Sequence, residues 1–134
     1  MNTHYFWPLL LFLLLLGCSE PRPNIPNGVE VSGKVLLPNG SPVTGGTLIL
    51  RPEQGIHGAS AVLGADGSFR LQNQAGTQAI VPGKYRVYVR FNDPAHKNLA
   101  AAIHKRYQDT EDGDSDIVVD IQAAQSDLLI KMKR

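Results

Sequence analysis

The sequence predicts an all-β fold, an antiparallel β-sandwich of about seven short strands. Three observations support this prediction. Apolar and polar residues alternate with a period of two in several segments, turn-forming residues separate those segments, and only one stretch has helical character. Alternation of this kind is typical of strands that bury one face and expose the other. Short alternating strands with frequent turns are typical of two sheets that share one core.

The first three predicted strands are residues 29–37, 47–51 and 59–63. One face of the first strand carries Val29, Val31, Gly33, Val35 and Leu37, and the opposite face carries Glu30, Ser32 and Lys34. The turn sequence Pro-Asn-Gly-Ser-Pro at residues 38–42 follows it, and Pro52 ends the second strand.

The middle of the chain continues the same pattern. Asp66-Gly67 is a turn pair, and it predicts a hairpin between residues 59–63 and the next strand, residues 68–71. The clearest strand is residues 84–91, which begins directly after Pro-Gly. Its inward residues are Tyr85, Val87, Val89 and Phe91, and its outward residues are Lys84, Arg86, Tyr88 and Arg90.

The last two predicted strands are residues 116–121 and 127–133, joined by a turn over residues 122–126. Their inward residues are Ile117, Val119, Ile121, Leu128, Ile130 and Met132. Residues 92–106 are rich in alanine, and they predict either a turn or two of helix or a long ordered loop.

The chain has 134 residues, a formal net charge of +1 and one cysteine. This size allows one modest hydrophobic core, which we place in a single domain over residues 29–134. The balanced charge argues against a nucleic-acid-binding protein, which would need a broad basic surface. Because a single cysteine cannot form an intrachain disulfide, packing alone must hold the fold.

The N-terminus carries an apolar run over residues 5–17. A helix that spans a bilayer needs roughly 20 apolar residues, so this run is too short to cross. An apolar run of this length at the N-terminus, ending in small residues, is typical of a signal peptide, which we assign to residues 1–17. The residues that follow, 19–27, are polar and rich in proline, and they provide no core in which Cys18 could be buried.

The segment Leu-Leu-Gly-Cys at residues 15–18 resembles the lipobox of bacterial lipoproteins. The resemblance implies cleavage after Gly17 and attachment of lipid to Cys18, with residues 18–28 forming the lipidated cysteine and a flexible tether. It also implies a membrane partner, held through the lipid anchor, in the bacterial cell envelope facing the periplasm or the exterior. An uncleaved anchor and a plain secretion signal are the alternatives. Ser19 does not decide between the inner and the outer membrane.

A second resemblance rests on Val-Ser-Gly-Lys-Val at residues 31–35, Gly-Gly-Thr-Leu at 45–48, Ala-Asp-Gly-Ser-Phe-Arg-Leu at 65–71 and Val-Pro-Gly-Lys-Tyr-Arg-Val at 81–87. Together these segments resemble the carboxypeptidase regulatory-like domain, whose fold is a transthyretin-like, prealbumin-type sandwich. The resemblance implies a non-catalytic module in which Tyr85 points inward and helps to close the sandwich. The Tyr-Arg-Gly-Ser C-terminus of transthyretin-like hydrolases is absent, since this chain ends in Lys-Met-Lys-Arg.

The candidate binding face is the outward stripe of residues 84–91, made of Lys84, Arg86, Tyr88 and Arg90. Arginine and tyrosine are favoured at protein interfaces, and an envelope protein or a glycan is the partner that we expect. The alternative is an ordinary solvated strand face.

Carboxylates cluster at Asp109, Glu111, Asp112, Asp114 and Asp116. The alternate spacing from Asp112 resembles a calcium loop, but such a loop needs glycine at its sixth place and glutamate at its twelfth. Those places hold Ile117 and Ala123. We therefore expect a solvated acidic loop, paired in part with residues 104–106, and weak calcium binding is the alternative.

No motif in the sequence indicates catalysis, a cofactor or a metal site. His57, His96 and His104 lack metal-ligand spacing, and Ser60 and Ser68 lack the Gly-x-Ser-x-Gly pattern of a nucleophile elbow. We therefore expect no enzymatic activity and no cofactor. The function that we expect is a lipid-anchored module with a binding or structural role in the envelope. The alternatives are a calcium- or glycan-binding module and, last, a degenerate transthyretin-like hydrolase.

Overall fold

The computed structural model describes residues 27–134, and within them it has eight β-strands and three short helical segments. The strands are β1 (Val31–Leu36), β2 (Thr47–Pro52), β3 (Ala59–Val62), β4 (Ser68–Arg70), β5 (Gln72–Asn73), β6 (Gly83–Arg90), β7 (Val118–Ile121) and β8 (Gln125–Lys131). The α-helix α1 covers Lys97–Ala102, and 3-10 helices cover Pro94–His96 and Lys105–Tyr107.

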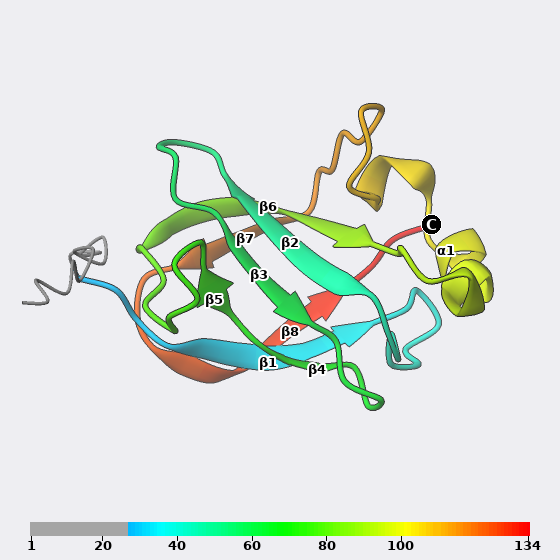
Figure 1. The fold of residues 1–134 in the computed structure, drawn as a ribbon, viewed down its shortest axis with the longest axis horizontal. Helices are drawn as coiled ribbons and strands as arrows, with labels where there is room; N and C mark the ends of the chain where they lie inside the picture. Colours follow the sequence, from blue (N-terminus) through cyan, green and yellow to red (C-terminus); the bar gives the residue numbers. More distant parts are fainter. Residues whose placement is uncertain (1–26) are drawn as a thin grey trace, which may run out of the picture.

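The strands form two sheets, drawn in Figure 1. The small sheet has the order β4-β1-β8, and the large sheet has the order β5-β3-β2-β6-β7. One continuous core lies between them, because buried Val35 and Ile130 of the small sheet belong to the same cluster as Leu48, Val87 and Ile121 of the large sheet. The predicted all-β sandwich is confirmed.

The period-two pattern is confirmed along most strands. In β1, Val31 and Val35 are buried while Lys34 between them is exposed, and β8 buries Ile130 between exposed Leu129 and Lys131. In β6, Tyr85 is buried, and its hydroxyl donates a hydrogen bond to the backbone carbonyl of Val81, four residues earlier. This bond satisfies the polar end of an inward tyrosine and joins the start of β6 to the segment before it.

Two strand pairings differ from those that we expected. First, β1 and β8 are parallel, with Val35 opposite Ile130 and a shift in register between Val31 and Gly33. Because β1 and β8 lie far apart in the sequence, no short turn joins them and constrains their relative direction. Second, the predicted hairpin between residues 59–63 and 68–71 is wrong as a strand pair, because β3 pairs with β2 and β5 whereas β4 pairs with β1.

The turn within that false hairpin is nevertheless present. The amide of Gly67 donates to the carbonyl of Gly64, at 3.0 Å, and Gly67 has a φ of 76°. A Cβ atom at Gly67 would lie 2.7 Å from the carbonyl oxygen of Val35, so both the left-handed backbone and the close approach of β1 require glycine. The turn therefore carries the chain from the large sheet to the small one instead of folding it back on one sheet.

Residues 92–106 contain helix, as one of the two expectations had it. Asp93 caps the first 3-10 turn, since its carboxylate accepts from the amide of Ala95 at 2.9 Å. The segment packs onto the core through Ile103, and Tyr107 directly after it is buried as well. In Figure 1 this helical segment lies at the end of the sandwich near the C-terminus.

The predicted signal peptide, the predicted lipid-attachment residue Cys18 and most of the predicted tether lie outside the described residues. Within residues 27–134, no helix is both long and apolar enough to cross a membrane. The folded part begins beside the isolated bridge between Val29 and Ile80, where each amide donates to the carbonyl of the other, at 2.8 and 2.9 Å.

Candidate binding surfaces

The predicted binding stripe on β6 is only partly exposed. Lys84, Arg86 and Arg90 are exposed, but Tyr88 retains only 4% of its accessible surface. Tyr88 still points away from the core, and it is buried because the segment after the second 3-10 helix folds over it. The Tyr88 hydroxyl accepts a hydrogen bond from the amide of Ser115, at 3.3 Å. The expectation that Tyr88 is an outward contact residue is therefore wrong.

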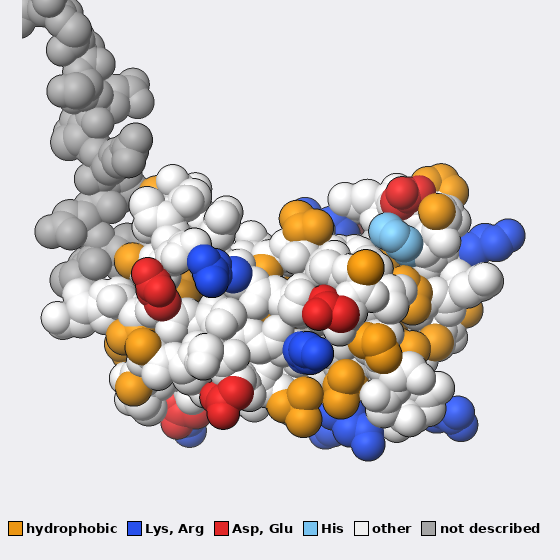
Figure 2. Space-filling model, turned by 90° about the horizontal axis from the view of Figure 1, so that it is seen from below, with side chains coloured by type: hydrophobic (Ala, Val, Ile, Leu, Met, Phe, Trp, Pro, Cys, Tyr) orange, Lys and Arg blue, Asp and Glu red, His pale blue; other side chains and the backbone are white. Residues whose placement is uncertain are grey.

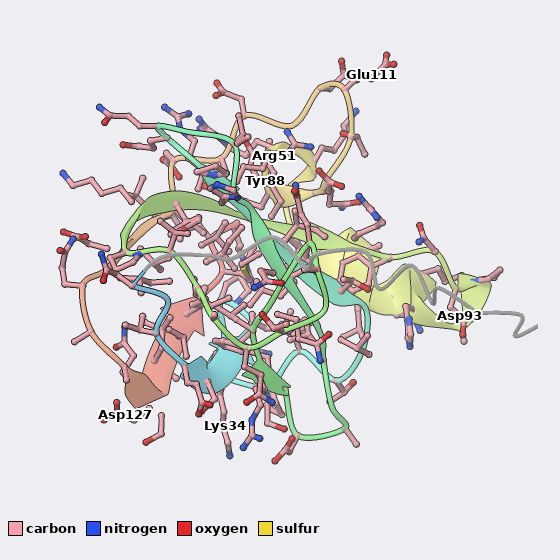
Figure 3. The ribbon with its side chains drawn as sticks, turned by 60° about the vertical axis from the view of Figure 1, so that its left-hand side comes forward. Lys34, Arg51, Tyr88, Asp93, Glu111 and Asp127 are labelled. Atoms are coloured by element: carbon pink, nitrogen blue, oxygen red, sulfur yellow. The ribbon has the colours of Figure 1, made fainter. Side chains whose placement is uncertain are left out.

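A cluster of opposite charges holds this covering segment on the large sheet. The carboxylate of Asp109, whose side chain is 6% exposed, pairs with both Arg51 of β2 and Arg90 of β6. Arg90 Nε donates to Asp109 Oδ2 at 3.0 Å. Arg51 also lies over the ring of Tyr88, with 4.4 Å between the guanidinium carbon and the ring centre. Figure 3 shows Arg51 beside Tyr88, with Glu111 at the tip of the loop beyond them.

Arg86 is engaged in the same way. It lies 3.7 Å from a carboxylate oxygen of Glu53 and 3.5 Å from one of Asp114, and it donates to the Ser115 carbonyl at 3.2 Å. Within residues 27–134, Lys84 is the basic residue of the stripe that forms no ion pair. Arg86 and Arg90 are thus paired with carboxylates of the same chain. The stripe therefore serves as a contact face for the chain's own loop.

The acidic cluster differs from the solvated loop that we expected. The side chain of Asp109 is almost fully buried, as described above. Asp114 lies near both Arg106 and Arg86. Asp116 accepts a hydrogen bond from the hydroxyl of Tyr107 at 2.9 Å. The hydrogen bond from Tyr107 and the nearby ammonium of Lys133 lower the pKa of Asp116. Burial, followed by the bond to Asp116, raises the pKa of Tyr107. Glu111 and Asp112 are exposed, as expected for a solvated loop.

Residues 27–134 contain no group of three or more histidine, cysteine or acidic side chains placed to hold a metal ion. His96 and His104 make local contacts. His96 packs edge-on against Phe91, with 6.3 Å between ring centres, and His104 Nδ1 accepts from the amide of Arg106 at 3.2 Å. Ser68 bonds to Asp66 in the turn before β4, and that bond is the main cause that lowers the pKa of Asp66.

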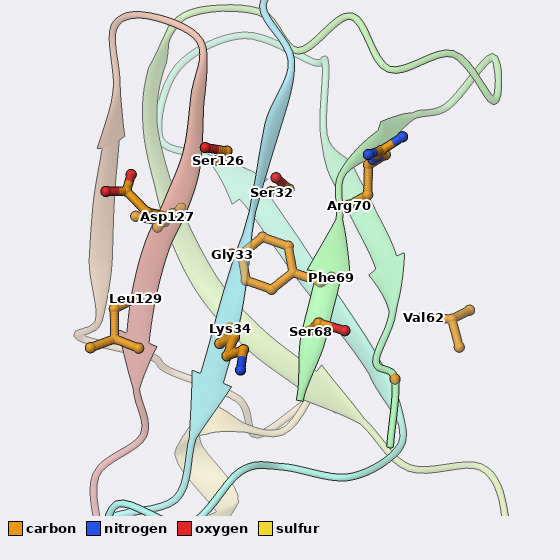
Figure 4. Close-up of a pocket in the computed structure, with 12 residues that line it drawn as sticks. Ser32, Gly33, Lys34, Val62, Ser68, Phe69, Arg70, Ser126, Asp127 and Leu129 are labelled. Carbon is orange, nitrogen blue, oxygen red and sulfur yellow. The ribbon is translucent and has the colours of Figure 1, made fainter. Parts of the chain in front are cut away.

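A shallow groove of about 700 Å³ lies on the outer face of the small sheet. It is lined by polar side chains of all three strands, which are drawn in Figure 4: Ser32, Lys34, Ser68, Arg70, Ser126 and Asp127. Leu129 of β8 lies at one margin and Val62 of β3 at the other, and they are 61% and 79% exposed. In Figure 3, Lys34 and Asp127 lie on the side of the molecule away from the Arg51 and Tyr88 contact.

Lys34 and Arg70 are the basic residues of this groove, and neither forms an ion pair within the described part of the chain. Their strands place them together, because Ser32 is opposite Arg70 and Lys34 is opposite Ser68 in the β1–β4 ladder. Alternation in the sequence marks both side chains as outward, but it does not show that β1 pairs with β4. The sequence analysis therefore missed this surface.

On the face shown in Figure 2, acidic and basic side chains lie among apolar ones. Three comparisons with known proteins gave no match: no protein-family model matches the chain, no curated protein matches it, and no solved structure matches it.

Proposed function

We propose that the chain is a lipid-anchored, non-catalytic β-sandwich module of the bacterial envelope, and that it binds an anionic glycan on the outer face of its small sheet. The proposed anchor is Cys18, in the lipobox-like segment at residues 15–18. The described fold begins about ten residues later, a length that reaches at most roughly 35 Å. Such a tether would keep the domain close to the membrane surface.

The observation that carries the binding proposal is the pair of basic side chains in the groove, Lys34 and Arg70. Both lack an ion-pair partner within residues 27–134, in contrast to Arg51, Arg86 and Arg90 of the large sheet. The hydroxyls of Ser32 and Ser126 line the same groove. Guanidinium and ammonium groups bind carboxylates or phosphates, and hydroxyls can donate to or accept from sugar hydroxyls. This combination favours a polar ligand that carries negative charge.

The resemblance to carboxypeptidase regulatory-like domains supports the non-catalytic part of the proposal. The sandwich with Tyr85 turned inward at the start of β6 agrees with that resemblance, although a fold by itself does not determine an activity. The second candidate, calcium binding by the acidic loop, is weakened because Asp109 and Asp114 already pair with arginines.

The experiment measures retention of the full-length chain, in detergent, on immobilised polygalacturonate, with neutral dextran as the reference matrix. We expect retention on the acidic polysaccharide alone, and loss of most of it in Lys34→Glu/Arg70→Glu. The matched control is Lys97→Glu/Lys105→Glu, which changes the net charge equally at exposed residues that form no ion pair in the described structure. Equal loss in both double variants, or no retention of the unaltered chain, would contradict the proposed surface.

A further inference from the structure

Strand β8 forms the longest open sheet edge in the described structure. It has seven residues and pairs with β1 alone. The other edge strands, β4, β5 and β7, have three, two and four residues. An edge strand presents a row of unpaired backbone donors and acceptors, and it can extend its sheet by pairing with another chain.

The register of the β1–β8 ladder determines which backbone groups are free. The amide of Met132 donates to the carbonyl of Leu36, at 2.8 Å, so the backbone of Met132 faces β1. Neighbouring residues of a strand direct their backbone groups to opposite sides. Ile130 and Leu128 therefore also face β1, whereas Lys131 and Leu129 direct their amides and carbonyls to the open edge. Asp127 precedes this regular part of the strand and lies where the register of the ladder shifts, between Gln125 and Leu128.

The side chains of Asp127, Leu129 and Lys131 share the outer face of the small sheet. Leu129 is 61% exposed, and Asp127 and Lys131 are exposed on either side of it. Figure 4 shows Asp127 and Leu129 on β8 at the margin of the sheet. Neither Asp127 nor Lys131 forms an ion pair within residues 27–134. An exposed leucine thus lies midway between two unpaired and opposite charges.

We propose that two copies of this chain pair antiparallel through β8, with Leu129 opposite Leu129 of the second copy. In this register Asp127 is opposite Lys131 of the second copy, and the symmetric contact repeats the pair. At Leu129 the backbone groups of both copies face the open edge, so ladder bonds can form between the two leucines. The exposed leucines cover each other, and the two small sheets become one continuous sheet across a two-fold axis.

The leucine contact and the two charge pairs together favour this register among those that the free backbone groups permit. A shift of the second copy by two residues removes the leucine contact and places Leu129 opposite Asp127 or opposite Lys131. A shift by four places Asp127 opposite Asp127 or Lys131 opposite Lys131. Like charges directly opposite are destabilising, whereas opposite charges stabilise a cross-strand pair. A slip by one residue would turn the wrong backbone groups to the partner strand. The contact involves one strand from each copy, so we expect a weak dimer that dissociates on dilution.

The test introduces a cysteine at the position that would face itself. Residues directly opposite in an antiparallel ladder have Cα atoms about 5.5 Å apart, which suits a disulfide. We expect Leu129→Cys, in the full-length chain purified in detergent and oxidised with copper phenanthroline, to form a disulfide-linked dimer. The matched control is Val62→Cys, which is 79% exposed on the large sheet. The unaltered chain measures any contribution from Cys18.

Charge reversal in the Leu129→Cys background tests the register. Asp127→Lys and Lys131→Asp should each lower cross-linking several-fold, because two attractive contacts become repulsive. A mixture of these two variants should restore cross-linking between unlike chains, since each lysine then meets an aspartate. Thermal melts should be unchanged, because both residues are exposed. Cross-linking of Leu129→Cys no greater than that of Val62→Cys, or charge reversals without effect, would overturn the proposal.

Discussion

The guanidinium of Arg51 lies over the ring of Tyr88, with 4.4 Å between the guanidinium carbon and the ring centre. The two residues come from neighbouring strands of the large sheet, and Asp109 joins Arg51 to Arg90 on the same face. The ring of Tyr88 thus has a cation on one face, and its hydroxyl accepts a hydrogen bond from the amide of Ser115, so Tyr88 takes part in contacts within the chain. The large sheet therefore uses its outer face to hold the 108–116 segment.

The first prediction concerns the Asp109 carboxylate. Asp109→Asn should destabilise the domain by about 1–2 kcal/mol, because it removes a nearly buried negative charge and replaces one of the two oxygens that face the arginines with a donor, although both arginines are about half exposed. Asp112→Asn is the control, since Asp112 is exposed and forms no ion pair in the described structure, and it should change stability by less than about 0.5 kcal/mol. Urea unfolding of a soluble form that begins at Ser19 measures both. Equal effects would mean that the cluster does not hold the loop.

The second prediction tests the register of β6. Val87 is fully buried, so Val87→Asp places an unpaired carboxylate in the core and should cost several kcal/mol, enough to unfold a marginally stable domain. Lys84→Asp, on the opposite face, should cost less than about 0.5 kcal/mol. Thermal melts followed by circular dichroism give the comparison. If both variants melt at the same temperature, the inward and outward faces are assigned incorrectly.

Arg86→Asp should have an intermediate effect. It removes contacts with Glu53, Asp114 and the Ser115 carbonyl and places a like charge beside both carboxylates. Because these groups are largely solvated, the cost should be about 1 kcal/mol, and it should shrink at high salt. Melts at low and at high sodium chloride measure this change. A cost that does not depend on salt would contradict the electrostatic explanation.

The pH dependence should appear on the alkaline side. Burial raises the pKa of Tyr85, and burial together with the bond to Asp116 raises the pKa of Tyr107. A raised folded pKa means that the neutral phenols stabilise the fold below the unfolded pKa near 10, and that this contribution is lost as pH rises through the folded values. The free energy of unfolding should therefore fall above about pH 10. Urea titrations at pH 8 and pH 11 test this, and a fall of the same size in Tyr85→Phe/Tyr107→Phe would exclude these phenols as its cause.

Calcium should have no specific effect on stability. A true site with a Kd near 10⁻⁵ M would add about 2.7 kcal/mol at millimolar calcium. Since Asp109 and Asp114 are paired with arginines, we expect only the small change that sodium chloride of equal ionic strength also gives. A calcium-specific gain that disappears in Asp112→Asn/Asp114→Asn would favour the calcium-binding alternative.

The strand positions could be predicted because alternation is a local property. Alternation with polar or outward-facing neighbours predicts that Val35, Val87 and Ile130 lie in the core, and all three are buried. The partners of the strands could not be predicted in the same way. The Asp66-Gly67 turn is correct, yet the chain crosses from one sheet to the other there, because β4 finds its ladder partner in β1. Pairing over long sequence distances depends on packing, which a local pattern does not contain.

The candidate sites show the same division. Alternation placed Tyr88 on the outer face correctly, but burial of Tyr88 depends on Asp109 and Ser115, more than twenty residues later. The groove residues Lys34 and Arg70 come together only through the pairing of β1 with β4. A residue's direction from the sheet is thus a sequence-level property, whereas its neighbours across the sheet are a property of the fold.

The most direct test of the central claim is the fate of Cys18→Ser in bacterial cells. Attachment of acyl chains, at about 0.8 kcal/mol for each buried CH₂ group, would hold the unaltered chain in the membrane fraction with a mature mass that begins at a lipidated Cys18. Fractionation and intact-mass spectrometry measure both properties. We expect the variant to lose the lipid and to appear as an unprocessed or a soluble species. A variant that stays in the membrane fraction with the mature mass expected after cleavage would contradict lipid anchoring at Cys18.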